Sequence, residues 1–446
     1  MNNQPAKREL KKFLGPAFGL AVMVGGTIGV GILRTPGPIA ALVQNGWLMI
    51  AVWIIGGIYV LIAAGSLAEL ATMLPKAGGG FNYVKRAFGN YAGFVTGWFD
   101  YILNAISPAY FSIAISEYLV LLFPRLHGNE TVIALAVLVA FTFLHLAGIK
   151  SGSMAQQVTS VLKLLALVTL VVCCFLWKGD APHAATTAPA LNYTLTGGLF
   201  IGLLRSMLLV LGAYNGWGVP VFFAEEDTNP GKHIPRSLFA GAIIVMVVYV
   251  LINAALLYVL PVQTMAGSKL AAADAAAIVF GNTGATVITL IALFSLLSIL
   301  NAYMMVNPRI LFGLSREGFF IPQGAAINKG GTPATALIIT SVLGVVMILT
   351  GSFERLFALG AFMSMVVNSL LFASVFKLRQ SAPALPRPYR AWGYPFTTLF
   401  MLLVSIGFFI GFAYSDPQNF IAILIITGLI WVFFKFVIQP RLNAKV

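Results

Sequence analysis

The chain has 446 residues, of which 59% are hydrophobic and only 9% are charged, whereas an average soluble domain carries about 25% charged residues. So few charges cannot cover the surface of a water-soluble protein of this length, which excludes a cytosolic enzyme, a secreted module and a disordered chain. The apolar residues stand in long runs and not in alternation, so the composition predicts an all-α protein with many membrane-spanning helices.

Twelve apolar segments are expected to cross the bilayer, because each is close to the about 20 residues that a membrane-spanning helix needs. They cover approximately 16–42, 47–74, 90–123, 130–148, 156–177, 197–224, 237–260, 276–306, 333–350, 354–377, 394–414 and 418–437. The longest connection runs from 178 to 196, so no soluble domain is expected between the spans.

The basic residues divide unequally between the two sides of these spans. With the N-terminus placed inside, 20 of the 27 Lys and Arg residues fall on inner segments, five on outer segments and two within spans. Positive residues concentrate on the cytoplasmic side of membrane proteins. We therefore expect an integral protein of the cytoplasmic (inner) membrane whose segments 1–15 and 438–446 are both cytoplasmic. Attraction to anionic membrane lipid follows, and the net charge of +14 needs no nucleic-acid partner.

Two spans carry clusters of helix-breaking residues at similar depth. The first reads GLAVMVGGTIGVGILRTPGPIAAL, and the sixth reads GLFIGLLRSMLLVLGAYNGWGVPVFFAEE. Glycine weakens a helix and proline removes a backbone donor, so we expect both helices to be discontinuous. One such cluster is typical of close helix packing, but two clusters five spans apart favour a functional break.

The spacing of the two broken spans predicts an inverted repeat. Five is an odd number, so span 6 crosses the membrane in the direction opposite to span 1. We expect one repeat over 16–178 (helices 1–5), a second over 197–377 (helices 6–10), and two further helices over 394–437. Discontinuous helices at a repeat interface are typical of a substrate site at the bilayer midplane.

The free ends of the two broken helices predict the chemistry of this site. A half-helix that begins near Gly31 offers backbone N–H groups and the positive end of a helix dipole, which suit a carboxylate. A half-helix that ends near Gly212 offers free carbonyls, which suit an ammonium group. A site with both fits the zwitterion of an α-amino acid.

Several strings in order along the chain resemble the amino acid–polyamine–organocation (APC) superfamily. They include GGTIGVGILRTP in span 1, GAYNGWGVPVFFAEEDTNPGKHIPRSL in span 6, LNAYMMVNPRILFGLSREGFFIP around span 8 and RPYRAWGYP before span 11. The chain is most similar to the L-type/cationic amino acid transporter branch. The resemblance implies alternating access, with substrate held between helices 1, 3, 6, 8 and 10. It also implies transport either with a proton (H+) or by sodium-independent exchange.

The resemblance assigns substrate contacts to the two glycine-rich loops. The carboxylate is expected at the backbone of Gly29, Val30 and Gly31, and the amino group at carbonyls of Thr27, Gly212 and Asn215. The site residues of the two loops are Thr27, Ile28, Gly29, Val30, Gly31, Gly212, Ala213, Asn215 and Gly216. Many relatives carry an aromatic lid where Gly212 stands, so either the substrate is bulky or Tyr214, Trp217 or Phe111 supplies the ring.

Charged residues inside the membrane are expected to be functional. Lys163 lies midway along span 5, where relatives carry a lysine that contacts the helix-1 loop and replaces a sodium ion; snorkelling to the surface is the alternative. We assign the coupling role to Lys163. Three residues are candidates for an outer gate, by pairing (for example Arg205 with Glu117) or separately: Glu117, Arg205 and Arg34. Glu69 is a candidate for an inner gate.

Further polar residues at midplane depth are Asn104, Ser107 and Asn301, which line the pocket or bond between helices. No free carboxylate is apparent near this depth, which favours neutral, large apolar or aromatic substrates. A polyamine or other organic amine is the alternative substrate.

Other functional classes find little support in the sequence. A channel needs a filter and an intramembrane enzyme needs a catalytic constellation, and neither pattern is present. The four histidines are scattered, so we expect no metal and no cofactor. The loop FPRLHGNETV has no cysteine, whereas heteromeric relatives join an ancillary subunit through one there. We expect a monomer or homodimer without a disulfide-linked subunit.

Overall fold

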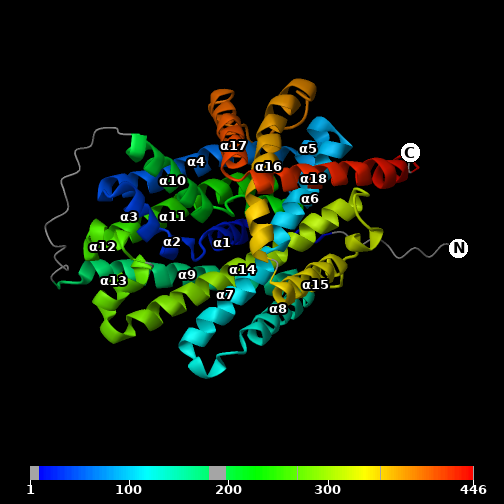
Figure 1. The fold of residues 1–446 in the computed structure, drawn as a ribbon. Coiled ribbons are helices and arrows are strands. Elements are labelled where there is room, and N and C mark those ends of the chain that lie inside the picture. The colour runs from blue at the N-terminus through cyan, green and yellow to red at the C-terminus, as the bar shows by residue number, and fades with distance from the viewer. Residues whose placement is uncertain (1–9, 180–196, 269, 352, 445–446) are drawn as a thin grey trace.

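The computed structural model describes residues 10–179, 197–268, 270–351 and 353–444, and these form a bundle of helices (Figure 1). Within those ranges the β-structure is limited to one isolated bridge between Leu14 and Asp227. The all-α class predicted from composition is confirmed.

The first half of the chain contains nine α-helices and one short 3-10 helix among the described residues. They are α1 (Pro16–Thr27), α2 (Gly31–Arg34), α3 (Pro36–Val43), α4 (Gly46–Met73), α5 (Phe81–Phe88), α6 (Asn90–Ala105), α7 (Ser107–Leu122), η1 (Pro124–Leu126), α8 (Glu130–Leu146) and α9 (Ile149–Leu176).

The second half continues in the same manner and contains a π-helical turn, η5, directly before its last helix. Its elements are α10 (Gly197–Ala213), η2 (Val219–Phe223), α11 (Pro230–Val259), α12 (Val262–Ala266), α13 (Ala271–Phe280), η3 (Gly281–Thr283), α14 (Gly284–Arg316), η4 (Pro322–Ala325), α15 (Ala334–Thr350), α16 (Phe353–Ser381), α17 (Phe396–Ser415), α18 (Pro417–Phe433), η5 (Phe434–Ile438) and α19 (Gln439–Asn443).

Among the described residues, eight helical segments are long and apolar enough to cross a membrane, and four shorter apolar helices accompany them. Several helices differ from the predicted bounds because a helix continues past the end of its apolar stretch. α9 and α11 each begin seven residues earlier than predicted, and α14 runs to Arg316 instead of 306. The predicted eighth span lies within the apolar segment Ala271–Arg316, but it is not one continuous helix, because Gly281 with φ +59° separates α13 from α14.

Both predicted helix breaks are present. α1 ends at Thr27, and helical structure resumes at Gly31; α10 ends at Ala213, and η2 begins at Val219. The two interruptions touch, because a Cβ atom on Gly216 would lie 2.2 Å from the carbonyl oxygen of Gly26. Gly216 also has φ +102°, a backbone conformation that favours glycine.

A third break was not predicted from the sequence. The expected single span 90–123 is divided at Ile106 into α6 and α7. Pro108 has no N–H to donate to the carbonyl of Asn104, four residues earlier. That carbonyl instead accepts a hydrogen bond of 2.9 Å from Asn307 Nδ2 of α14. An amide side chain thus replaces the missing backbone donor inside the bundle.

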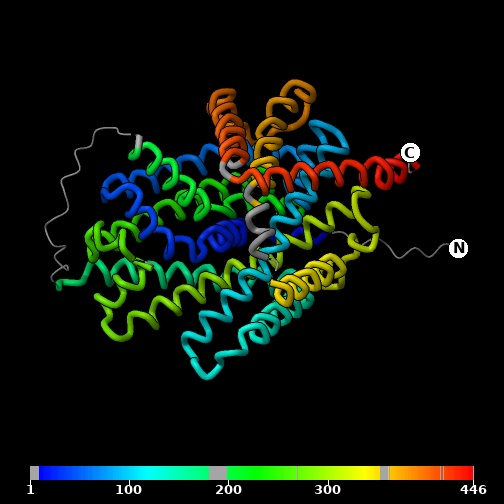
Figure 2. Tube along the Cα trace, viewed as in Figure 1, coloured from blue at the N-terminus to red at the C-terminus, as the bar shows by residue number. Residues whose placement is uncertain are grey.

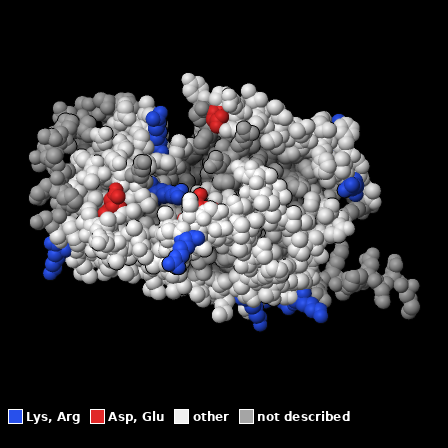
Figure 3. Space-filling model, turned by 60° about the horizontal axis from the view of Figure 1, so that its bottom comes forward, with Lys and Arg blue, Asp and Glu red and all other residues white. Residues whose placement is uncertain are grey.

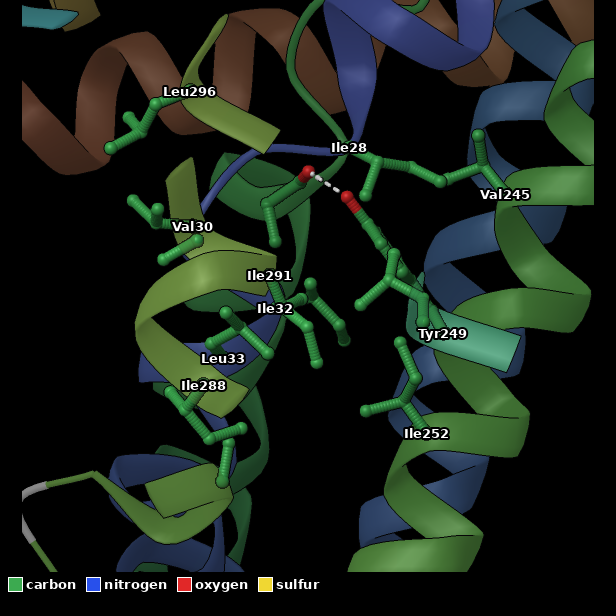
Figure 4. Packing of buried hydrophobic residues seen from close by; sticks show 14 of the residues in the cluster. Ile28, Val30, Ile32, Leu33, Val245, Tyr249, Ile252, Ile288, Ile291 and Leu296 are labelled. Carbon is green, nitrogen blue, oxygen red and sulfur yellow. Dashed lines mark hydrogen bonds between the residues drawn. The ribbon is translucent and has the colours of Figure 1, made fainter. Parts of the chain in front are cut away.

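The broken first helix lies in the interior of the bundle, in contact with α9, α11 and α14. Figure 4 shows Ile28, Val30 and Ile32 packed between α11 and α14, with Tyr249 of α11 beside them. By contrast, α17 and α18 contact α16 at the periphery (Figure 2) and expose many of their side chains.

Charged contacts gather at one end of the molecule. Seven of the eight ion pairs among the described residues involve loops and helix ends on the side where the N-terminal segment packs against Glu226 and Thr228. Along the face shown in Figure 3, charged side chains are few among the uncharged ones, and basic and acidic side chains adjoin in the hollow near its centre. Such a face suits helices that are surrounded by lipid.

Replacing Gly216 with alanine should destabilise the protein, because the new Cβ would strike the Gly26 carbonyl and the backbone has a positive φ. Strained backbone of this kind costs about 1–3 kcal/mol, and the overlap adds to that. We expect a clearly lower melting temperature in detergent, with poor recovery as a monodisperse peak. The matched control is Gly407→Ala, since a Cβ there meets nothing within 4 Å. Equal melting of the two variants would contradict the close approach.

Candidate functional site

A cavity lies beside the unwound segment that follows α10. Its wall includes Asn215, Gly216 and Trp217 from that segment and Leu67 from α4. The remaining wall comes from α6, α7, η2, α14 and α16. Helices far apart in the sequence therefore meet at the second helix break. The backbone N–H and C=O groups of this unwound segment do not take part in the hydrogen bonds of a regular helix.

The polar groups of the cavity come from four helices. They are Asp100 and Asn104 of α6, Ser107 of α7, Tyr303 of α14, and Ser364 and Asn368 of α16. The Asn104 side chain donates from Nδ2 to Asp100, both to its carbonyl oxygen at 2.6 Å and to its carboxylate Oδ1 at 2.9 Å. The cavity can thus offer hydroxyl, amide and carboxylate oxygens to a bound molecule.

A carboxylate in this wall contradicts the expectation of a site without one. Asp100 stands within the predicted third span and is 8% exposed. The sequence did carry a signal, because an acidic residue in an apolar span is expected to face the bundle interior and to be functional. The helix rotation that turns Asp100 toward the cavity was not evident from the sequence.

Side chains of α9 donate hydrogen bonds to backbone carbonyls of α1 and of the unwound segment that follows it. Lys163 is fully buried, and its Nζ donates to the carbonyl oxygens of Gly25 at 2.9 Å and Ile28 at 2.5 Å. Ser160 Oγ and Gln156 Nε2 both donate to the carbonyl of Ala21. The C-terminal end of a helix carries partial negative charge, so an ammonium group is favourable there. Lys163 thus contacts the unwound segment and does not snorkel.

A tyrosine joins the two broken helices. Tyr249 Oη donates to the carbonyls of Ala213 at 2.8 Å and Thr27 at 3.2 Å, and the dashed bond in Figure 4 starts at this hydroxyl. Gly31 packs directly on Ala213, since a Cβ on Gly31 would lie 3.4 Å from the Ala213 Cα. The Thr27 and Ala213 carbonyls are therefore already bonded in this conformation.

The predicted substrate residues divide into two groups. Four line the cavity: Asn104, Ser107, Asn215 and Gly216. Those of the first loop (Thr27, Ile28, Gly29, Val30 and Gly31), together with Gly212 and Ala213, lie outside its wall. Asn301 is completely buried and donates from Nδ2 to Gly152 O and Gln156 Oε1. Asn301 therefore links α14 to α9 and does not face the cavity.

Of the three aromatic residues considered as a lid, only Trp217 lines the cavity. The Tyr214 side chain is buried and its hydroxyl donates to the Trp53 carbonyl. Phe111 packs on the ring of Tyr303 with ring centroids 5.7 Å apart. Gly212 is exposed, and a Cβ there would meet nothing within 4 Å. Space for a larger side chain is thus present at Gly212.

The two outer gate candidates do not form an ion pair with each other within the described ranges; both Arg205 and Glu117 are exposed. Glu117 instead lines a second, outer cavity together with Arg34 and Tyr118. Arg34 belongs to α2 in the broken first helix, so this basic side chain and Glu117 border the same space.

The inner gate candidate Glu69 is buried and receives several donors. Arg379 donates to its two carboxylate oxygens at 2.8 and 2.6 Å. Arg387 Nε lies 3.4 Å from Oε1, and the backbone N–H of Ala391 donates to Oε2 at 2.7 Å. This carboxylate fastens the end of α4 to α16 and to the segment before α17.

A second buried ion pair, between Glu226 and Arg309, joins the end of span 6 to α14. Arg309 donates through both Nε and Nη2, the latter at 2.8 Å. Neighbouring Glu225 binds Arg316 in the same bidentate manner. Burial acts to raise the pKa of Glu225, but hydrogen bonds from Arg316 and Ala77 N outweigh it and leave the pKa below its usual value.

The described part of the chain contains no group of three or more His, Cys, Asp or Glu residues arranged to hold a metal ion.

Comparisons with known proteins identify the family and several relatives of the chain. The model of a family described as amino acid permease matches residues 17–434. The serine/threonine exchanger SteT of Bacillus subtilis is 29% identical over 407 residues, 90% of each chain. The human large neutral amino acids transporter small subunit 2 is 27% identical, over 85% of this chain and 72% of the relative. The mouse b(0,+)-type amino acid transporter 1 is 25% identical, over 98% and 91%.

Replacing Lys163 with methionine should loosen the first helix break, because two buried carbonyls would lose their donor. Each unsatisfied buried group costs about 1–3 kcal/mol. We expect faster backbone hydrogen exchange in peptides covering Val24–Val30 and a lower melting temperature. The control, Lys150→Met, removes an exposed lysine from the same helix. Unchanged exchange in the Lys163 variant would show that the break does not depend on this side chain.

Proposed function

The chain belongs to the amino acid permease family of the APC superfamily, and from that premise we propose that it carries amino acids across the cytoplasmic membrane by alternating access. Members of this family are transporters and not enzymes. The observation that carries the proposal is the cavity at the second helix break, where unwound backbone and polar side chains from four helices converge. Unwound backbone at a cavity inside the membrane is typical of transporter substrate sites.

We propose that the twelve apolar segments form the inverted repeat expected from the sequence, with helices 1–5 over 16–178, helices 6–10 over 197–377 and two peripheral helices over 394–437. The breaks in the first and sixth segments support this relationship. Both ends of the chain, 1–15 and 438–446, are then cytoplasmic. The gathering of ion pairs and basic loops at one end supports this orientation.

The zwitterion is proposed to bind at the two breaks. Asn215 and Gly216 already line the cavity and would receive the amino group. The backbone N–H groups of Gly29, Val30 and Gly31 would receive the carboxylate. Because Gly31 packs against Ala213 here, this contact requires the outer half of the first helix to move away from Ala213. Separation of the two half-helices would open that part of the site.

Transport is proposed to be independent of sodium. The Lys163 ammonium lies at the carbonyls where α1 ends and supplies the positive charge that a metal ion would otherwise provide there. If Lys163 keeps its proton throughout the cycle, the protein exchanges one substrate for another. If Lys163 releases and regains the proton in each cycle, transport is coupled to protons. The name of the B. subtilis relative, an exchanger, favours the first mode for this chain.

Two sets of charged residues are proposed as gates. On the inner side, Glu226 with Arg309 and Glu69 with Arg379 join helices whose separation would open the site. On the outer side, Glu117 lies with Arg34 around the outer cavity, and Arg205 remains a separate candidate. Breaking a buried pair costs several kcal/mol, so these contacts have to be replaced during the cycle.

We propose that the chain works without a disulfide-linked subunit, as a monomer or homodimer. One relative is named as a small subunit; the name refers to that relative and not to this chain. In this chain the only two cysteines are Cys173 and Cys174, both within α9. The loop between the third and fourth spans, FPRLHGNETV, carries none, so a link of the heteromeric kind has no attachment point there.

The test is uptake and counterflow in proteoliposomes of the purified chain. We expect saturable uptake of α-amino acids that preloaded amino acid stimulates and that sodium does not change. An imposed pH gradient separates exchange from proton coupling. Uptake of agmatine or putrescine without any α-amino acid would move the function to amine transport. Unsaturable flux would indicate a channel and contradict the proposal.

Replacing Gly212 with tryptophan should narrow substrate choice. The open space at this position can accept a ring without a clash, and the ring would occupy volume next to the second break. We expect loss of uptake for large amino acids with small ones retained. The control is Gly212→Ala, which adds little volume. Unchanged uptake of every amino acid by the tryptophan variant would remove Gly212 from the substrate path.

A further inference from the structure

Asp100 differs from the other buried acidic residues in having no basic partner. Glu69 and Glu226 are each paired with arginine, and Asp227 is paired with His233. Within the described ranges no lysine, arginine or histidine lies at ion-pair distance from Asp100. Its carboxylate accepts one hydrogen bond, at Oδ1 from Asn104. The second oxygen, Oδ2, accepts none from the described residues.

An ionised carboxylate at this depth is unfavourable unless a positive charge or several donors compensate it. Asn104 supplies a single neutral donor, which is weaker than a charged one. The other buried carboxylates show how this chain satisfies an acid in its interior, namely with a guanidinium or an imidazole from a neighbouring segment. Asp100 faces the cavity instead of such a partner.

The position of Asp100 suits the far end of a bound amino acid. The same cavity is lined by Asn215 and Gly216 at the second break and by Asp100 on α6. A single ligand that lies in the cavity can therefore place its backbone groups at the break and its side chain against α6. Tyr303, Ser364 and Asn368 line the same space and offer further oxygen acceptors for N–H groups.

We propose that Asp100 is the specificity-determining residue of the site and that it binds a cationic side-chain group, an ammonium or guanidinium, of the transported amino acid. This rests on the proposed function as an amino acid transporter and names its substrate class. The substrate's charge replaces the partner that the chain lacks. A neutral side chain of similar length would leave the carboxylate uncompensated in the closed site, so it binds less well.

The first experiment uses the unmodified protein and needs no variant to fold. Thermal shifts in detergent are measured with lysine, with Nε-acetyl-lysine, which has the same backbone groups but no side-chain charge, and with leucine. We expect lysine to bind at least about tenfold more tightly than the other two. Equal or tighter binding of Nε-acetyl-lysine or leucine would overturn the role of Asp100, while leaving amino acid transport in place.

The second experiment compares uptake by wild type and Asp100→Asn in proteoliposomes. We expect the ratio of kcat/KM for lysine to that for leucine to fall at least about tenfold. The control, Asp274→Asn, removes an exposed aspartate and should leave the ratio unchanged. If Asp100 instead carries a proton, the variant keeps its lysine-to-leucine ratio and loses its response to a pH gradient, which overturns the proposal. A wild type that transports no amino acid overturns the proposed function itself.

Discussion

The carbonyl groups left free where the first helix breaks are the constraint on which the rest of the structure depends. Lipid offers no hydrogen bonds, so every such group needs a donor from the protein. α9 supplies Lys163 for Gly25 and Ile28, and α11 supplies Tyr249 for Thr27 and Ala213. Both helices must therefore pack against α1, and this places the two breaks side by side. The cavity lies beside the second of them, where helices from both halves of the chain complete its wall.

Much of the fold can be predicted from the sequence, because segments that are surrounded by lipid have to be apolar and can be recognised by their composition. Long apolar runs indicate the spans, and the glycines and prolines of the first and sixth runs indicate the breaks. Hydropathy does not indicate where a helix ends, since α9, α11 and α14 continue into polar segments. The break at Ile106 was missed because a single proline within a span usually only bends it, and because Asn307, which completes the break, lies 203 residues after the Asn104 that it contacts.

The site was less predictable, because spacing along a helix does not give its rotation. Asn104, Ser107, Asn215 and Gly216 line the cavity, whereas Asn301, an equally polar residue at similar depth, links two helices. Asp100 was not predicted although it is charged, because the glycine clusters that indicate the site lie on the two broken helices and Asp100 stands on a different span. The pairing of Arg205 with Glu117 rested on shared depth alone, and the structure instead places Glu117 near Arg34.

The carboxylate of Glu69 also decides which parts of the molecule can move together. It binds Arg379 of α16, Arg387 and the backbone of Ala391, while Ser66 one turn earlier on α4 bonds to Thr398 of α17. These contacts join α4 to the end of α16 and to the start of α17. While they hold, a tilt of α4 carries the start of α17 with it, so a label on the exposed surface of α17 would report when the Glu69 contacts are kept and when they are broken.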